Sequence, residues 1–292
     1  MSALLAILLV TYGVTLGRGV DTWLTRSTWS RDHPRLALRL WQACGIATPS
    51  ALIGAALVLT HDRRASPWWD TAVLLVAVPI TGFSLDVVRR KIVAARIRER
   101  HRRLVRICGR PTADRDVYLL DTPEVAAYCV PGPRRSGRVI VTSAGRRLLT
   151  DAEMAATVAH ERAHLDQRHH AEILLADAIT GLLAPIGLLR NYATQTRRLV
   201  EMAADDQAAR QCGPQTVAAA LLRVGAAARF PAPGPSPFLG IAASFTAERI
   251  RRLLQPARPT GRPLLLAVGA LVLVVTLVPP ALIIGPQNVG LP

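Results

Sequence analysis

The sequence predicts an α+β protein, in which a polytopic α-helical membrane region of about four spans is joined to a mainly helical domain carrying a small β-sheet. Half of the 292 residues are hydrophobic, and the mean hydropathy is +0.27. Only 4% are aromatic, so the apolar content comes mainly from Leu, Ala, Val and Ile, which suits membrane helices better than a large soluble core. We expect a membrane region with three spans over residues 1–90, a polar domain over 91–260, and a last span with a short tail over 261–292.

Four apolar segments account for the expected spans. Three of them are near the roughly 20 residues that a helix needs to cross a bilayer, and the first is shorter and relies on Arg18 at its end. Asp86 lies inside the third segment, so the membrane-spanning part can end before Asp86. No basic residue precedes the first segment and no small-residue cleavage site follows it, so we expect a membrane helix there and not a signal peptide. The segments are Ala3–Gly17, Leu40–Thr60, Thr71–Val88 and Leu264–Gly285.

Arginine placement predicts the orientation of these spans. The formal net charge is +16, carried almost wholly by arginine, and the densest basic run, Arg89 to Arg103, follows the third segment. Since short cytoplasmic loops are enriched in Arg and Lys, we expect a multi-pass protein of the cell membrane with its N-terminus outside and its polar domain in the cytoplasm. The basic run either contacts anionic headgroups of the lipid bilayer or is a solvated helix surface. The sequence has neither zinc-finger spacing nor a basic helix with interleaved aromatics, so we expect no direct binding of nucleic acid.

The polar domain begins with short strands and continues with a well-marked helix. Pro and Gly turns separate three β-like segments, at Asp116–Leu120, Val125–Val130 and Arg138–Ser143. Thr150 and Glu153 then form a capping-box pattern, which predicts a helix from there to about His170.

The predicted helix carries the sequence His160-Glu161-Arg162-Ala163-His164, an intact H-E-x-x-H motif. Residues four apart face the same side of a helix, so both imidazoles can bind one Zn²⁺. Glu161 lies one position further round, where its carboxylate can take a proton from water activated by the metal. The alternative is a pair of surface histidines with a coincidental glutamate. With only seven histidines in the chain, coincidence is the weaker explanation.

A catalytic zinc site of this kind needs a third protein ligand and one open position. Glu201 and Asp205 are four apart in a second helical segment. We therefore predict that Glu201 is the third ligand and that Asp205 binds a ligating imidazole and fixes its tautomer. Taken alone, Glu201 would be interpreted as a surface carboxylate near Arg197 or Arg198.

The pairing of H-E-x-x-H with E-x-x-x-D resembles the gluzincin proteases. More closely, the stretch from Thr150 to His169 is similar to membrane proteases of the HtpX and CAAX-protease type and to the BlaR/MecR-type antirepressor metalloproteases. The segments Ala127–Pro131, Arg138–Thr142 and Glu248–Leu253 agree with this resemblance. Three spans before the polar domain and one after it match the BlaR/MecR arrangement better than that of HtpX, here without the penicillin-binding sensor of the full receptors.

The resemblance implies a zincin-like catalytic domain holding one Zn²⁺ per chain. It assigns His160, His164 and Glu201 to the metal, Glu161 to catalysis, and Asp205 to support of a ligand. It also implies that the strand around Ala127, Tyr128 and Cys129 is the sheet edge that receives the substrate backbone by strand addition.

Two features depart from the HtpX pattern. The edge strand reads Val125-Ala-Ala-Tyr where those enzymes carry Asn, and Ser244-Phe-Thr-Ala stands in place of a His-Pro. The residue that stabilises the oxyanion therefore stays open among Tyr192, Arg249 and Arg252. The two histidines at the end of the motif helix, His169 and His170, are not expected to be ligands.

A further apolar stretch, Ile173–Leu189, lies between His164 and Glu201. If it crossed the bilayer once, the two ligands would lie on opposite sides and no metal site would form. The site therefore requires a core helix, a re-entrant hairpin or an interfacial segment, and we favour packed helices close to the membrane.

These features predict a membrane-embedded zinc endopeptidase that cleaves a protein or peptide substrate at the cytoplasmic face. By analogy with the antirepressor proteases, the role is expected to be regulatory and the substrate a transcriptional repressor or another signalling protein. One alternative is quality control of membrane proteins of the HtpX kind. The other is a non-catalytic signalling receptor that holds zinc structurally.

Overall fold

The computed structural model describes residues 2–61, 69–114, 116–132, 137–227, 239–255 and 261–288. The chain folds into two compact units, and each is assembled from separate stretches of sequence. The first unit contains residues 1–90, 173–197 and 259–292, and the second contains 91–172 and 198–258.

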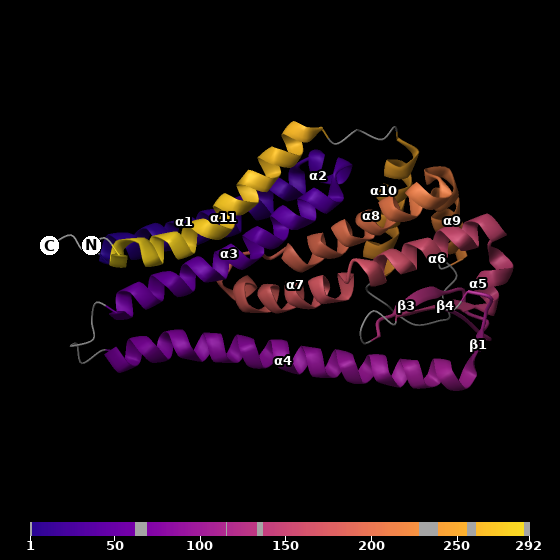
Figure 1. Ribbon diagram of the computed structural model, residues 1–292, viewed down its shortest axis with the longest axis horizontal. Coiled ribbons are helices and arrows are strands. Elements are labelled where there is room, and N and C mark those ends of the chain that lie inside the picture. The colour runs from indigo at the N-terminus through magenta and orange to yellow at the C-terminus, as the bar shows by residue number, and fades with distance from the viewer. Residues whose placement is uncertain are drawn as a thin grey trace. The chain divides into compact units, whose positions relative to one another are not determined.

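The first unit is helical, and small side chains line the contact between its first two long helices. Helices α1 (Ser2–Arg26), α3 (Pro34–His61) and α11 (Arg262–Asn288) lie side by side, with the short α2 (Trp29–Asp32) before α3 (Figure 1). Ala6 of α1 and Ala51 and Ala55 of α3 are buried where these two helices meet, because alanines allow helix axes to approach closely. The Tyr12 hydroxyl donates to the Val275 carbonyl at 2.8 Å and so connects α1 to α11.

Among the described residues, three helices are long and apolar enough to cross a membrane, over Ala3–Val20, Pro34–Leu59 and Arg262–Leu282. They contain most of the first, second and fourth expected segments. The third, Thr71–Val88, falls in the first half of α4 (Trp69–Cys108), where Asp86 accepts hydrogen bonds from Arg89 and Arg90 at 2.9 and 2.5 Å. A fourth span and the orientation of the spans stay predictions.

The stretch between the two ligand helices forms a helical hairpin. Helix α7 (His169–Leu183) is followed by a 3-10 turn (Ala184–Ile186), and the chain then reverses through Gly187 and Leu189, both at positive φ, into α8 (Tyr192–Cys212). Thr180 of α7 accepts a hydrogen bond from the Ala193 amide of α8 at 3.1 Å, so the two helices run side by side. The apolar stretch therefore turns back, as the metal site requires.

The second unit contains a four-stranded sheet of order β1-β2-β4-β3. Strand β2 is parallel to β4, and the outer strands are antiparallel to their neighbours. Three strands were predicted; the fourth, β1, is three residues long and carries Gly and Pro, so it has no strand signal in the sequence. The bounds are β1 Gly109–Pro111, β2 Val117–Leu120, β3 Ala127–Val130 and β4 Arg138–Thr142.

Helix α6 carries the H-E-x-x-H motif and begins with the capping box that was predicted. Thr150 and Glu153 exchange the two hydrogen bonds of this motif. The helix spans Asp151–Asp166, shorter than expected, because Arg168 adopts a left-handed conformation (φ 54°) and the chain starts a new helix, α7, at His169.

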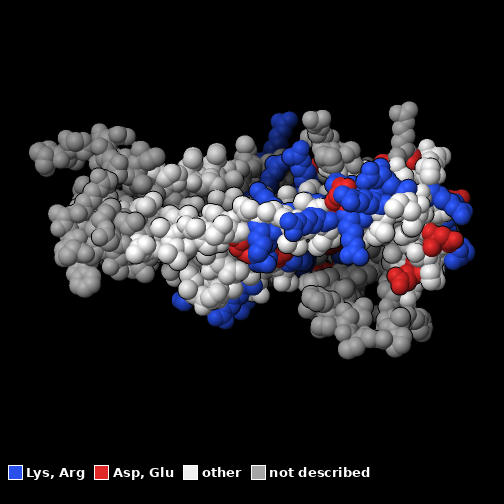
Figure 2. Space-filling view, turned by 90° about the horizontal axis from the view of Figure 1, so that it is seen from below, with Lys and Arg blue, Asp and Glu red and all other residues white. Residues whose placement is uncertain are grey.

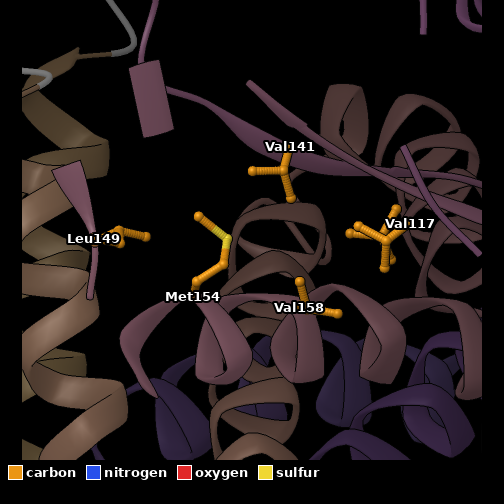
Figure 3. Packing of buried hydrophobic residues seen from close by; sticks show 6 residues of the cluster. Val117, Val141, Leu149, Met154 and Val158 are labelled. Carbon is orange, nitrogen blue, oxygen red and sulfur yellow. The ribbon is translucent and has the colours of Figure 1, made fainter. Parts of the chain in front are cut away.

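One face of α6 packs on the sheet and another on helices. Met154 and Val158 of α6 meet Val117 and Val141 of the sheet, with Leu149 beside them (Figure 3). A second cluster joins α6 to α8, α9 (Pro214–Ala227) and α10 (Leu239–Leu254); it comprises Ala156, Ala159, Ala208, Val217, Ala218 and Leu253. The helix that presents the motif is thus fixed from both sides.

The second half of α4 presents a basic surface. Lys and Arg side chains gather over this helix in Figure 2. Glu99 accepts hydrogen bonds from Arg102, Arg103 and Arg106, so part of this charge is neutralised within the helix. Contact of the surface with lipid headgroups stays a prediction.

Candidate metal centre

Helices α6 and α8 bring His160, His164 and Glu201 together in the second unit. The two Nε2 atoms are 3.1 Å apart, and each lies 3.5 Å from a Glu201 carboxylate oxygen. The three side chains are the group that the described residues offer for holding a metal ion, with one donor atom from each within 4.8 Å of the others.

These separations fit a tetrahedral zinc site. Zinc lies about 2.0–2.1 Å from imidazole nitrogen and carboxylate oxygen, and a tetrahedron of that radius has edges of about 3.3–3.4 Å. The observed separations of 3.1, 3.5 and 3.5 Å bracket this value. Two imidazoles and one carboxylate are also the donor set of catalytic zinc sites that keep a fourth position open.

Asp205 lies beside the first of the two histidines. Its side chain is fully buried, and its Oδ1 lies 3.0 Å from His160 Nδ1. Arg249 of α10 donates to both Asp205 oxygens at 2.7 Å and lies 2.8 Å from Glu201 through Nη1. The guanidinium therefore joins the third metal-ligating candidate to the carboxylate that orients His160.

His169 supports the second histidine, and sequence reasoning missed this role. Its Nδ1 lies 2.9 Å from His164 Nδ1, and the residue is buried. It was set aside because it shares no helical register with both ligands. The left-handed Arg168 breaks that register and directs His169 to His164; no Gly or Asn marks this reversal in the sequence.

Charge and burial hold two of the three candidate ligands, Glu201 and His164, in the protonation state that binds a metal. Burial disfavours the anion of Glu201, but His160 and Arg249 outweigh it and keep the Glu201 pKa below its ordinary value. Burial lowers the pKa of His164 to about 4, so this imidazole is neutral at pH 7. For His160, burial opposes the cation, but Asp205 and Glu201 outweigh it and raise the pKa to about 9 in the metal-free protein.

Glu161 lies between the cluster and the edge strand of the sheet. Burial raises the pKa of Glu161, against the attraction of His160 and hydrogen bonding from the thiol and backbone of Cys129. A carboxylate with a raised pKa is better suited to accept and return a proton near neutral pH. Glu161 also lines a cavity together with His160 and Glu201, so the base candidate and two of the three ligand candidates face one space.

The remaining predicted residues lie in different places. Ala127, Tyr128 and Cys129 form most of β3, which is at the sheet edge among the described strands. Arg252 lies 2.6 Å from Asp206 and is not in the cluster. Tyr192 belongs to the first unit, where it is buried and stacks on Trp41 with ring centroids 5.4 Å apart.

The chain is similar to peptidase family M48 over residues 91–198. This range includes the sheet and the H-E-x-x-H helix, and it supports a metallopeptidase of the gluzincin kind. It stops before Glu201, so the third ligand candidate, Asp205 and Arg249 rest on the geometry described above. The similarity does not separate the BlaR/MecR type from the HtpX type. No solved structure was found that matches the chain.

Proposed function

We propose that the protein is a membrane-bound zinc endopeptidase. The observation that supports this proposal best is the convergence of His160, His164 and Glu201, at separations that fit one zinc ion. Glu161 lines a cavity that two of these residues, His160 and Glu201, also line. Similarity to a peptidase family over the helix that carries the motif supports it, and three helices of spanning length support attachment to a membrane.

In the proposed peptide hydrolysis, each of these residues has a separate role. Zinc, when bound, supplies Lewis-acid polarisation of the scissile carbonyl and activation of water. Glu161 accepts the proton of the attacking water on its carboxylate and donates it to the leaving amine. Asp205 and His169 fix the two imidazoles so that each presents Nε2 to the metal.

The outer edge of β3 is the proposed binding site for the substrate backbone. In an antiparallel pair, alternate residues direct their backbone N–H and C=O groups to the outer side. The Thr142 amide donates to the Ala126 carbonyl, so the backbone groups of Ala126 face β4. Cys129 is three residues further along, and its amide therefore points to the outer side. This orientation agrees with the hydrogen bond of that amide to Glu161. A peptide added to this edge would therefore lie beside the catalytic carboxylate.

Arg249 is a positioning residue in this proposal. Its Nε and both terminal nitrogens are engaged by Asp205 and Glu201, so it holds the carboxylates in place. Of the three candidates for stabilising the oxyanion it is the one that lines the cavity, and the assignment of the oxyanion partner stays open.

A regulatory role, with cleavage of a repressor or signalling protein at the cytoplasmic face, rests on the resemblance to antirepressor proteases. Comparison of protein levels between cells with and without the gene separates it from quality control. Accumulation of one or two proteins in the absence of the gene supports regulation, and accumulation of many supports quality control.

The E161Q variant tests the catalytic proposal. Full-length protein in detergent is expected to hold about one zinc per chain in both the parent and E161Q, while cleavage of an unfolded protein substrate falls by at least about 100-fold in the variant. The exposed Glu124, replaced in E124Q, is the matched control and should leave turnover unchanged. Turnover by E161Q at the parental rate would remove Glu161 as the base. A zinc-loaded parent without peptidase activity would favour the non-catalytic receptor.

A further inference from the structure

A cavity of about 190 Å³ opens beside the metal centre within the second unit. Its charged lining among the described residues consists of members of the centre itself, namely Glu161, Glu201 and Arg249, together with the His160 imidazole. The rest of its described wall is aliphatic except for Thr157 and Gly145, and the Thr157 hydroxyl is engaged by the Glu153 carbonyl at 2.9 Å. The aliphatic wall comprises Val125, Ala126, Ala127, Leu149, Met154, Ala156, Val217, Ala220, Leu221 and Val224.

The size and chemistry of the cavity define what it can hold. An apolar cavity of about 150 Å³ is large enough for a benzene ring, so 190 Å³ accommodates a Leu, Met or Phe side chain. A charged side chain placed there would lose its hydration without gaining a partner from the aliphatic wall. A glycine or alanine would leave most of the space unfilled, and unfilled apolar space destabilises a packed structure.

The position of the cavity relative to β3 indicates where such a side chain comes from. Ala126 and Ala127, at the start of the edge strand, form part of the wall, and Glu161 forms another part. A peptide extended along β3 directs alternate side chains to the same face. A residue whose backbone lies beside Glu161 can therefore direct its side chain into the cavity.

We infer that this cavity is a specificity pocket for a Leu-, Met- or Phe-sized apolar side chain next to the scissile bond, with Ala220 and Leu221 of α9 setting its depth. This inference rests on the proposed peptidase function. Ala220 is buried and Leu221 half-buried in the wall, so enlarging the first should shorten the pocket and truncating the second should lengthen it.

The test uses full-length, zinc-loaded E161Q in detergent and a set of fluorescent peptides that differ only at two adjacent central positions. Each position is varied in turn among Gly, Ala, Leu, Phe, Asp and Lys, and binding is measured by fluorescence anisotropy. We expect Leu and Phe at one of the two positions to bind about 10- to 200-fold more tightly than Gly or Asp. The same peptides are offered to the parent protein to measure kcat/KM.

Variants of α9 then test whether Ala220 and Leu221 determine the side-chain preference. In the E161Q background, A220L should weaken binding of the Phe peptide at least about tenfold while leaving the Ala peptide within about twofold. L221A should improve Phe relative to Leu. The controls are L222A, which truncates a neighbouring leucine that is 60% exposed, and A226L, which adds the same bulk at an exposed site of α9. Both should keep the parental order, and thermal unfolding of each variant checks that the fold is retained.

The outcomes distinguish failure of the proposed pocket from failure of the proposed peptidase activity. An unchanged order of preference in A220L and L221A, a preference for Asp or Lys, or no measurable peptide binding would overturn the pocket. Cleavage by the parent without any side-chain preference would also overturn the pocket and would leave the peptidase proposal standing. Graded binding to E161Q without cleavage by the parent would support the pocket and remove the proposed activity.

Discussion

His169 Nδ1 lies 2.9 Å from His164 Nδ1, and both side chains are largely shielded from solvent. One proton must lie between two nitrogens at this distance. Since His164 presents Nε2 to His160 and Glu201, we assign the proton to His164 Nδ1 and the acceptor role to His169. This hydrogen bond holds His164 in the tautomer that a metal requires.

H169A should therefore weaken zinc binding by about 10- to 100-fold, the usual effect of removing such a supporting partner. Competition with a chelator of known affinity measures this change. H170A is the matched control, since the neighbouring imidazole is not part of the centre. Equal zinc affinity in H169A and H170A would remove the supporting role.

Asp205 connects His160 to a buried guanidinium, so its loss should affect both the metal and the fold. D205A should lower zinc affinity about 10- to 100-fold. It should also destabilise the protein by about 3–5 kcal/mol, because Arg249 would keep its buried charge with one carboxylate partner fewer. D206A removes a carboxylate that pairs with Arg252, which is not part of the centre. It should destabilise the protein less than D205A. Chelator competition and thermal unfolding in detergent distinguish the two variants, and D206A matching D205A in both measurements would contradict this account.

Two adjacent arginines on α8 offer a comparison of buried and exposed ion pairs. Arg198 is 8% exposed and its Nε donates to Glu248 of α10 at 2.8 Å, whereas Arg197 is 47% exposed and pairs with Asp177. R198A should destabilise the protein by about 3 kcal/mol, since it leaves Glu248 without its principal partner. R197A should lower the free energy of unfolding by less than about 1 kcal/mol. Thermal unfolding should rank R198A well below R197A, and the reverse order would show that α10 is held by other contacts.

Gly45 of α3 lies where a side chain would overlap the hydroxyl and ring of Tyr192. Tyr192 is fully buried and stacked on Trp41, whose indole N–H donates to the Tyr192 carbonyl at 3.1 Å. The ring therefore has little freedom to move, and G45A should destabilise the first unit by about 1–3 kcal/mol or more. G19A, where nothing lies within 4 Å of the added carbon, should be neutral or stabilising by up to about 1 kcal/mol. Thermal unfolding in detergent measures both, and a G45A protein as stable as G19A would contradict the packing described.

Helical periodicity made much of the centre predictable. His160 and His164, like Glu201 and Asp205, are four residues apart, and a helix places such pairs on one face wherever the helix lies in the fold. The capping box at Thr150 is equally local, since both of its hydrogen bonds form within one turn. These features need no knowledge of distant contacts.

The parts that were missed depend on tertiary structure. His169 reaches His164 because Arg168 adopts a conformation that its side chain does not favour. Tyr192 was one of three candidates for the oxyanion partner, and the sequence did not indicate that it packs on Trp41 and is buried in the first unit. Arg249 was another of these candidates, and its ion pairs from α10 to Glu201 and Asp205 of α8 depend on how the two helices pack. The aliphatic cavity is lined by four separate stretches of sequence, and the helical spacing of its α9 residues indicates a buried helix face without indicating a cavity.

The Glu153 carboxylate does more than cap α6. One oxygen accepts from the Thr150 amide at 2.9 Å, and the other accepts from Arg223 of α9 at 2.7 Å. Arg223 is 52% exposed, whereas its partner is nearly enclosed, so a solvent-accessible cation links the helix bearing the histidines to the one bearing Ala220 and Leu221. On the proposed function, we expect an external anion or a protein contact that engages this guanidinium to weaken the link between α6 and α9. Since the three metal-ligating candidates lie on α6 and α8, the expected effect is on peptide preference and not on zinc content.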